Sequence, residues 1–133
     1  MVISLIFSIL LVICAGVCNA AMDIYTQKHF KSIFSKIKGN WFAEDSWKNK
    51  YKNRDFNQGE KFFGSTTFLV FITDFWHFAQ FMWINFIFIT LLLYPHNLLL
   101  ENNILDILFA FICYRTLYLI VFNIFYERVF MLK

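Results

Sequence analysis

The sequence has 133 residues, which is the length of one domain and no more. Hydrophobic residues make up 59% of the chain, aromatic residues 22% and charged residues 16%, and the formal net charge is +3. A water-soluble domain of this size buries only about two-thirds of the surface that its chain exposes, so it could not hide so many apolar side chains. The composition also excludes a disordered chain, a collagen and a disulfide scaffold. We therefore expect an all-α integral membrane protein.

Three apolar stretches are long enough to cross a bilayer. The first covers residues 2–22 without a charge, and at 1.5 Å per residue it is about 30 Å long, the thickness of one hydrocarbon core. The second covers residues 66–94 and the third residues 104–125. Pro95 separates these two because proline cannot continue a helical hydrogen-bond ladder. The sequence thus predicts three transmembrane helices in a single membrane domain, 1–133.

Residues 23–64 form a polar loop that sets the expected orientation. The loop holds nine of the twelve basic residues, namely Lys28, Lys31, Lys36, Lys38, Lys48, Lys50, Lys52, Arg54 and Lys61. Loops rich in Lys and Arg stay on the cytoplasmic side of a membrane. The 95–103 loop has no Lys or Arg and fits the opposite side, whereas Arg128 and Lys133 return the C-terminus to the cytoplasm. We expect a bacterial inner-membrane protein with its N-terminus outside and its C-terminus cytoplasmic.

The N-terminal part leaves one alternative open. The triplet Cys18–Ala20 resembles a cleavage site, so a secretory signal peptide is the second interpretation of residues 1–20. No Lys or Arg precedes the apolar run, and cleavage would export the basic loop, so we favour a transmembrane helix. In residues 24–37, helical spacing places the apolar side chains on one face and the Lys side chains on the other. This pattern predicts a short amphipathic helix on the membrane surface. The rest of the loop looks irregular, with Trp47 as an interfacial anchor.

The second predicted helix carries polar groups inside an apolar stretch. We expect Ser65 or Thr66 to cap its first turn. At 100° per residue, one face of this helix collects the polar side chains of Thr67, Asp74, His77 and Asn85. Such a face should point toward protein or water, because unpaired polar groups are costly in lipid.

Asp74 and His77 are the candidate catalytic residues. Their i, i+3 spacing places a carboxylate beside an imidazole, an arrangement that suits general acid–base chemistry. Asp23 follows the first span at the same expected depth and could complete a divalent metal site with the pair. The alternative is that the two side chains only satisfy each other near the membrane interface, where burial costs less.

Of the polar residues in the predicted spans, Arg115 should have the largest free-energy cost of insertion into the membrane, because it lies about 17 Å along the third span. A charged side chain in mid-membrane faces the bundle interior or finds a partner. We expect Arg115 to lie level with Asn85 and to pair with Asp74, His77 or a lipid phosphate. A structural tie between helices is an equally open interpretation.

Three segments resemble a sequence signature of small membrane proteins from Bacteroidetes-type bacteria that have no established activity. They are Ser46–Tyr51 (SWKNKY), Lys61–Phe71 (KFFGSTTFLVF) and Thr73–His77 (TDFWH). The resemblance implies that residues 46–77 act as a unit. It implies no catalytic assignment. The candidate binding residues are Asp23, Trp47, Lys48, Ser65, Thr67, Trp76, Asn85 and Arg115.

Three functions are compatible with these features. The first is a non-enzymatic subunit or an accessory or assembly factor, with membrane lipids and a protein partner or a second copy as its contacts. The second is a membrane enzyme that uses the Asp/His site on a lipid or isoprenoid headgroup at the cytoplasmic leaflet. The third is a proton or ion pathway formed by oligomers. Nucleic acid is not an expected partner, because five acidic residues dilute the basic loop.

Overall fold

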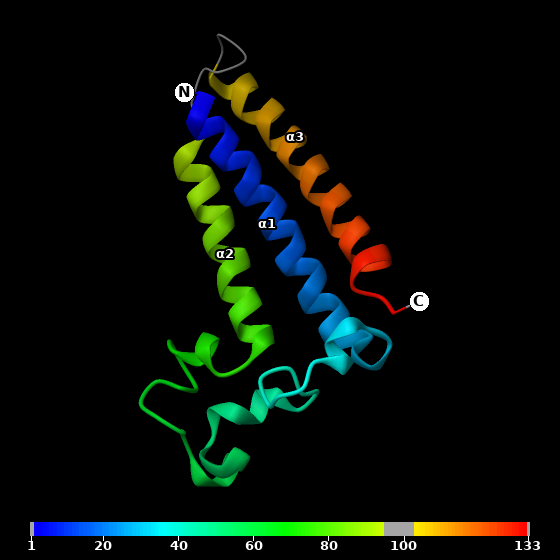
Figure 1. Ribbon diagram of the computed structural model, residues 1–133. Helices are drawn as coiled ribbons and strands as arrows, with labels where there is room; N and C mark the ends of the chain where they lie inside the picture. Colours follow the sequence, from blue (N-terminus) through cyan, green and yellow to red (C-terminus); the bar gives the residue numbers. More distant parts are fainter. Residues whose placement is uncertain (1, 95–102, 133) are drawn as a thin grey trace.

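Three long helices run side by side in the computed structural model, which describes residues 2–94 and 103–132 (Figure 1). They are α1 (Val2–Gln27), α2 (Phe75–Leu93) and α3 (Asn103–Ile124). A π-helical turn, η7 (Phe125–Val129), continues α3. No strand occurs among the described residues, and each of the three helices is long and apolar enough to cross a membrane. The predicted all-α fold with three membrane spans is confirmed.

Helix α1 lies in the middle of the arrangement, with α2 on one side of it and α3 on the other (Figure 1). Helix α1 packs against both neighbours along their lengths, whereas α2 and α3 meet only through long side chains. One such contact is the hydrogen bond from Trp83 Nε1 to the Tyr118 hydroxyl, at 3.0 Å. The buried side of α1 consists largely of small residues, including Ser8, Ala15 and Ala20. Small side chains allow neighbouring helices in a membrane to approach closely.

Gly16 lies at a close contact between α1 and α3. A β-carbon built at this position would lie 3.1 Å from the Tyr118 carbonyl oxygen and 3.1 Å from Val121 Cγ1. Any larger side chain would therefore push the two helices apart.

Residues 28–74 fold into a polar region at one end of the helices, built from turns and short 3-10 segments rather than from a long helix (Figure 1). Two predictions for this region are wrong. The expected amphipathic helix over 24–37 is instead the last turn of α1 followed by 3-10 segments at His29–Lys31 and Ile33–Lys36. The second span begins at Phe75 and not at residue 66, because Asp74 caps it there.

An aromatic cluster fastens this region to the helices. The Phe75 ring, on the first residue of α2, lies 4.9 Å from Phe34, 5.0 Å from Phe42 and 5.6 Å from Tyr25, measured between ring centroids. Phe130, which follows η7, packs on Phe34 at 5.3 Å. Such ring pairs stabilise a fold beyond the area that they bury. The cluster therefore joins the ends of all three helices.

The chain termini complete this picture. The C-terminal residues return to the polar region through backbone hydrogen bonds from Ile33 to Phe130 and from Leu132 to Lys31, each 2.9 Å long. The start of α1 lies at the opposite end of the helices (Figure 1). Helix α1 runs without a break through the alternative cleavage position, and Ala20 is fully buried there. The predicted outer loop, 95–103, lies outside the described residues except for Asn103.

We expect Gly16→Val to lower the stability of the protein by about 1–3 kcal/mol, the usual cost of overpacking a tight contact. The matched control is Cys14→Val, because Cys14 is exposed on the same turn of α1. Unfolding of both variants by a denaturing detergent, starting from mild micelles, measures the difference. Equal stability of the two variants would show that α1 and α3 do not depend on close approach at Gly16.

Candidate functional site

Asp74 and His77 meet at the first turn of α2, as the sequence predicted. Asp74 has extended backbone angles (φ −156°, ψ 164°), so it stands outside the helix as its N-cap. One carboxylate oxygen accepts the His77 backbone N–H at 3.1 Å. The other oxygen lies 2.6 Å from His77 Nδ1 and accepts the Thr73 hydroxyl at 3.0 Å. Asp74 is 1% exposed, so these groups replace water as its hydrogen-bond partners.

The hydrogen bonds from Thr73 and His77 stabilise the negative charge of Asp74. Burial favours the neutral acid and raises the pKa of the Asp74 carboxyl, but hydrogen bonds from the His77 side chain and backbone, with the nearby imidazole, outweigh it. The net result is a pKa below the ordinary value of an aspartic acid. Asp74 is thus held as a carboxylate whose acceptor positions are already used, which suits a helix cap better than a proton-transfer group.

The polar region holds the start of α2 from the other side. The Asn49 side chain, which is buried, donates to the Thr73 carbonyl at 3.2 Å and to the Asn40 carbonyl at 2.8 Å. The Phe75 backbone N–H donates to the Trp41 carbonyl at 3.1 Å. Backbone groups on both sides of Asp74 are therefore fixed by the loop, and the capping geometry depends on the loop fold.

Asp23 does not join Asp74 and His77. Tyr25 faces Phe75 beside the pair, and Asp23 lies two residues earlier, about 200° around α1. In residues 2–94 and 103–132, no group of three or more His, Cys, Asp or Glu side chains is suited to hold a metal ion. The metal site predicted from Asp23, Asp74 and His77 is therefore not formed.

Ser65 and Thr67 belong to the loop and not to α2, because α2 begins after them. Ser65 is buried, where its hydroxyl donates to the Lys50 carbonyl at 2.7 Å and accepts the Lys61 backbone N–H at 3.1 Å. Neither Ser65 nor Thr66 caps α2, which corrects that prediction. Thr67 is exposed, so the expected polar row on one face of the second span starts only at Asp74.

Trp47, Lys48 and Trp76 lie at different places in this region. Lys48 Nζ lies 5.7 Å from the centroid of the Trp47 ring; Trp47 is exposed and Lys48 is half-buried. Lys48 also forms an ion pair of 3.5 Å with Asp45. Trp76 packs against the aromatic cluster, and its ring meets His77 edge to face at 5.1 Å. Only Trp76 of these three contacts the Asp/His pair.

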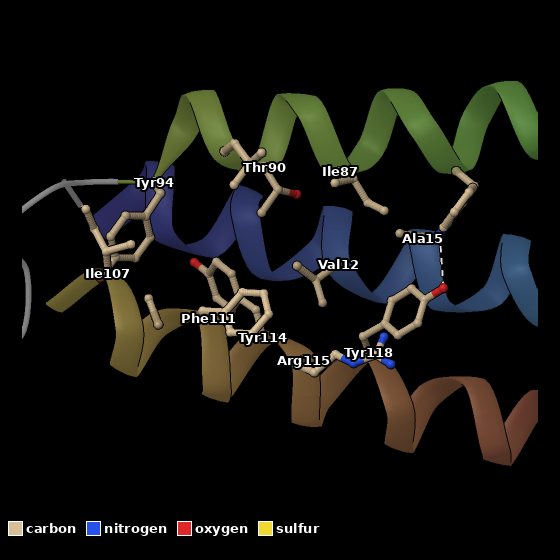
Figure 2. Close-up of a pocket in the computed structure, with 13 residues that line it drawn as sticks. Val12, Ala15, Ile87, Thr90, Tyr94, Ile107, Phe111, Tyr114, Arg115 and Tyr118 are labelled. Carbon is tan, nitrogen blue, oxygen red and sulfur yellow. Dashed lines mark hydrogen bonds between the residues drawn. The ribbon is translucent and has the colours of Figure 1, made fainter. Parts of the chain in front are cut away.

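Asn85 and Arg115 lie within the membrane spans, away from Asp74 and His77. The Asn85 amide donates to the Phe81 carbonyl in its own helix at 2.8 Å, so it needs no partner on another helix. Arg115 makes no ion pair with Asp74 or His77, so of the three partners predicted for it only the lipid phosphate stays a prediction. Its guanidinium lies 5.6 Å from the centroid of the Tyr118 ring and lines a groove between α2 and α3 (Figure 2).

Sequence reasoning missed several polar pairs that hold the spans together. The Ser8 hydroxyl lies 2.5 Å from the Tyr114 hydroxyl and so links α1 to α3. Asp106 is fully buried, and the Tyr94 hydroxyl donates to its carboxylate at 3.1 Å. A search for hydroxyl groups at matching depths on different spans could have suggested these pairs, because each needs a partner in lipid.

Comparisons of the chain with protein-family models, with characterised proteins and with solved structures found no match. The resemblance of the 46–77 segments to small bacterial membrane proteins therefore stays a prediction.

We expect Asp74→Ala to destabilise the protein by about 1–2 kcal/mol, because it removes the cap of α2. Asp74→Asn should cost clearly less, since asparagine is also a strong capping residue and keeps an oxygen for the His77 N–H. Unfolding in mild detergent at neutral pH measures both values. A loss in Asp74→Asn as large as in Asp74→Ala would assign the stabilisation to the charge and not to the cap.

The pH dependence of stability in the same variants separates the contribution of the Asp74 charge from that of its capping hydrogen bond. A carboxyl group whose pKa is lowered by folding stabilises the folded state above its unfolded pKa, about 3.9, and loses this effect as the pH falls through the folded pKa. Wild-type protein should therefore lose more stability below pH 4 than Asp74→Asn does. Asp45, Asp55 and Glu60 also have lowered pKa values, but they are present in both proteins and cancel in the difference.

Proposed function

We propose that this protein is a non-enzymatic subunit, or an accessory or assembly factor, of a larger membrane protein complex. The observation that carries this proposal is the open arrangement of the spans. In the most apolar stretch of each span, only 11 to 22% of the residues are buried within the chain. In the groove between α2 and α3, the Arg115 guanidinium has no ion-pair or hydrogen-bond partner in residues 2–94 and 103–132, and lipid tails cannot supply one.

The hydrogen bonds of Asp74 support a structural role for this residue. Asp74 is buried, and both of its oxygens already accept hydrogen bonds. Asp74 is therefore not available as a base, and an enzyme acting on a lipid or isoprenoid headgroup would have to use His77 Nε2 instead. A proton or ion pathway has less support, because Thr67 stands off the helix and Asn85 bonds to its own helix.

The distribution of charge supports a defined orientation in a bacterial inner membrane. The polar region with most of the basic residues and the end of η7 lie at one end of the helices, and the start of α1 lies at the other (Figure 1). By the positive-inside rule, the polar region faces the cytoplasm and contacts anionic lipid headgroups. A cysteine introduced at Lys52, which is exposed, should react with a membrane-impermeant thiol reagent only in inverted vesicles. Labelling of this cysteine in intact spheroplasts would show that the polar region faces the outside and that the protein has the opposite orientation.

A pull-down at native expression level tests the proposed function. The protein is tagged at its C-terminus, extracted in a mild detergent and analysed by native mass spectrometry. We expect a complex of fixed stoichiometry that contains at least one other membrane protein, and Asp74→Asn should preserve it because the cap is kept. An unrelated tagged protein with three spans gives the background. A monomer of 16.0 kDa without a partner would contradict the proposal.

A further inference from the structure

A largely apolar groove lies between α2 and α3 within the membrane spans (Figure 2). Its volume is about 430 Å³. Helix α1 forms the floor, where Val12 and Ala15 face the groove. Ile87 of α2 and Phe111 of α3 form part of its opposite walls. Since small residues on the floor leave space above α1, side chains from a fourth helix can enter there.

Most polar groups around this groove already have partners inside the chain. Trp83 Nε1 donates to the Tyr118 hydroxyl, and the Tyr114 hydroxyl bonds to Ser8. Arg115 is different, because it is exposed and makes no ion pair or hydrogen bond with any described residue. Its only described interaction is with the face of the Tyr118 ring. The groove thus contains one charged donor without an acceptor.

The depth of Arg115 limits what can supply that acceptor. Arg115 lies twelve residues after the start of α3, about 18 Å along the axis, and a similar length of helix separates it from the end of η7. This places it near the middle of a hydrocarbon core of about 30 Å. Phospholipid phosphates lie outside the core, about 15 Å from the midplane, whereas the guanidinium is held over Tyr118 inside the groove.

A second copy of this chain does not supply the acceptor either. In a symmetric oligomer whose axis is normal to the membrane, each copy presents the same residues at the same depth. Around the level of Arg115, residues 9–16 of α1, 83–90 of α2 and 112–118 of α3 contain no Asp or Glu. The buried carboxylate of Asp106 lies toward the start of α3 and is bonded to Tyr94. The matching acid has to come from another protein.

We propose that the α2–α3 groove binds a transmembrane helix of a different membrane protein, and that this helix carries an Asp or Glu near the bilayer midplane. Its carboxylate pairs with Arg115, whose planar guanidinium can form two parallel hydrogen bonds with a carboxylate. The apolar side chains of the helix fill the groove on both sides of the ion pair. This inference rests on the proposed function and names the partner surface and the partner chemistry.

Photocrosslinking in native membranes tests the proposal. A benzoylphenylalanine at Phe111, which lines the groove and is 66% exposed, should crosslink to an acid-bearing transmembrane segment of another protein. The same group at Ile120, which is 52% exposed on α3 outside the groove lining, is the matched control and should not give this product. Crosslinks to a second copy of the chain, or to lipid alone, would overturn the proposal.

Charge variants complete the test. Arg115→Gln should weaken the native complex at least about tenfold, Arg115→Lys less, and Arg128→Gln, a matched change in η7, should leave it intact. Exchange of the two charges, with Arg115→Glu in this protein and Lys in place of the crosslinked partner acid, should restore binding that Arg115→Glu alone removes. Failure of this exchange to restore binding would overturn the pairing. A complex that survives Arg115→Gln would overturn this inference but leave the proposed function standing. Absence of any complex in wild type would instead remove the proposed function.

A synthetic helix makes the groove testable without the native partner. The probe is an apolar peptide that spans phosphatidylcholine vesicles and carries one central Asp, with a central Leu version as its control. We expect energy transfer from labelled protein to the Asp peptide at about tenfold lower peptide concentration than to the Leu peptide, and Arg115→Gln should abolish this preference. Equal transfer to both peptides in wild type would overturn the pairing of Arg115 with a carboxylate.

Discussion

A carboxylate that leaves water must find hydrogen-bond donors, and this constraint shapes both ends of the described spans. Asp74 finds its donors in Thr73 and His77 at the start of α2, and Asp106 finds one in Tyr94 at the start of α3. Each carboxylate lies in the first turn or the cap of a helix, where the helix dipole also favours negative charge. Asp74 therefore fixes where α2 begins, and the hydrogen bonds of both acids account for their positions without any chemistry on a substrate.

The capping role of Asp74 connects the polar region to the membrane helices. Its geometry requires that Thr73 and Phe75 are held in place, and the loop does this through Asn49 and Trp41. The ring of Phe75 then enters the aromatic cluster, which also takes in the last turn of α1 through Tyr25. A loop without regular helices is thus ordered by hydrogen bonds and ring contacts at the helix ends. Several of its basic side chains, among them Lys31, Lys36 and Lys52, remain exposed.

The fold class and the three spans could be predicted because long apolar runs have few structural solutions in lipid. The proximity of Asp74 and His77 followed from their spacing alone. The start of α2 could not be predicted from hydropathy, since residues 66–72 are as apolar as a span, and only the capping contact of Asp74 ends the loop there. Asp23 was misplaced because depth along a helix says nothing about rotation around it. The partners of Ser8 and Tyr114 depend on helix packing, which pairwise spacing does not encode.

Arg115 differs from the other polar groups of the spans in a way that bears on function. Ser8, Trp83 and Asp106 each form a hydrogen bond with a residue of another span or its end. These bonds offset the free-energy cost of placing the polar groups in the membrane. The polar groups beside Arg115 in the groove, such as Trp83 and Tyr114, already bond to other residues, so among the described residues Arg115 contacts only the ring of Tyr118. Because an unpaired charge near the midplane is expensive, a helix with a carboxylate at the same depth would gain affinity and a fixed register from it. The same charge would disfavour a purely apolar helix in the groove, so in the proposed complex Arg115 would contribute to both affinity and selectivity.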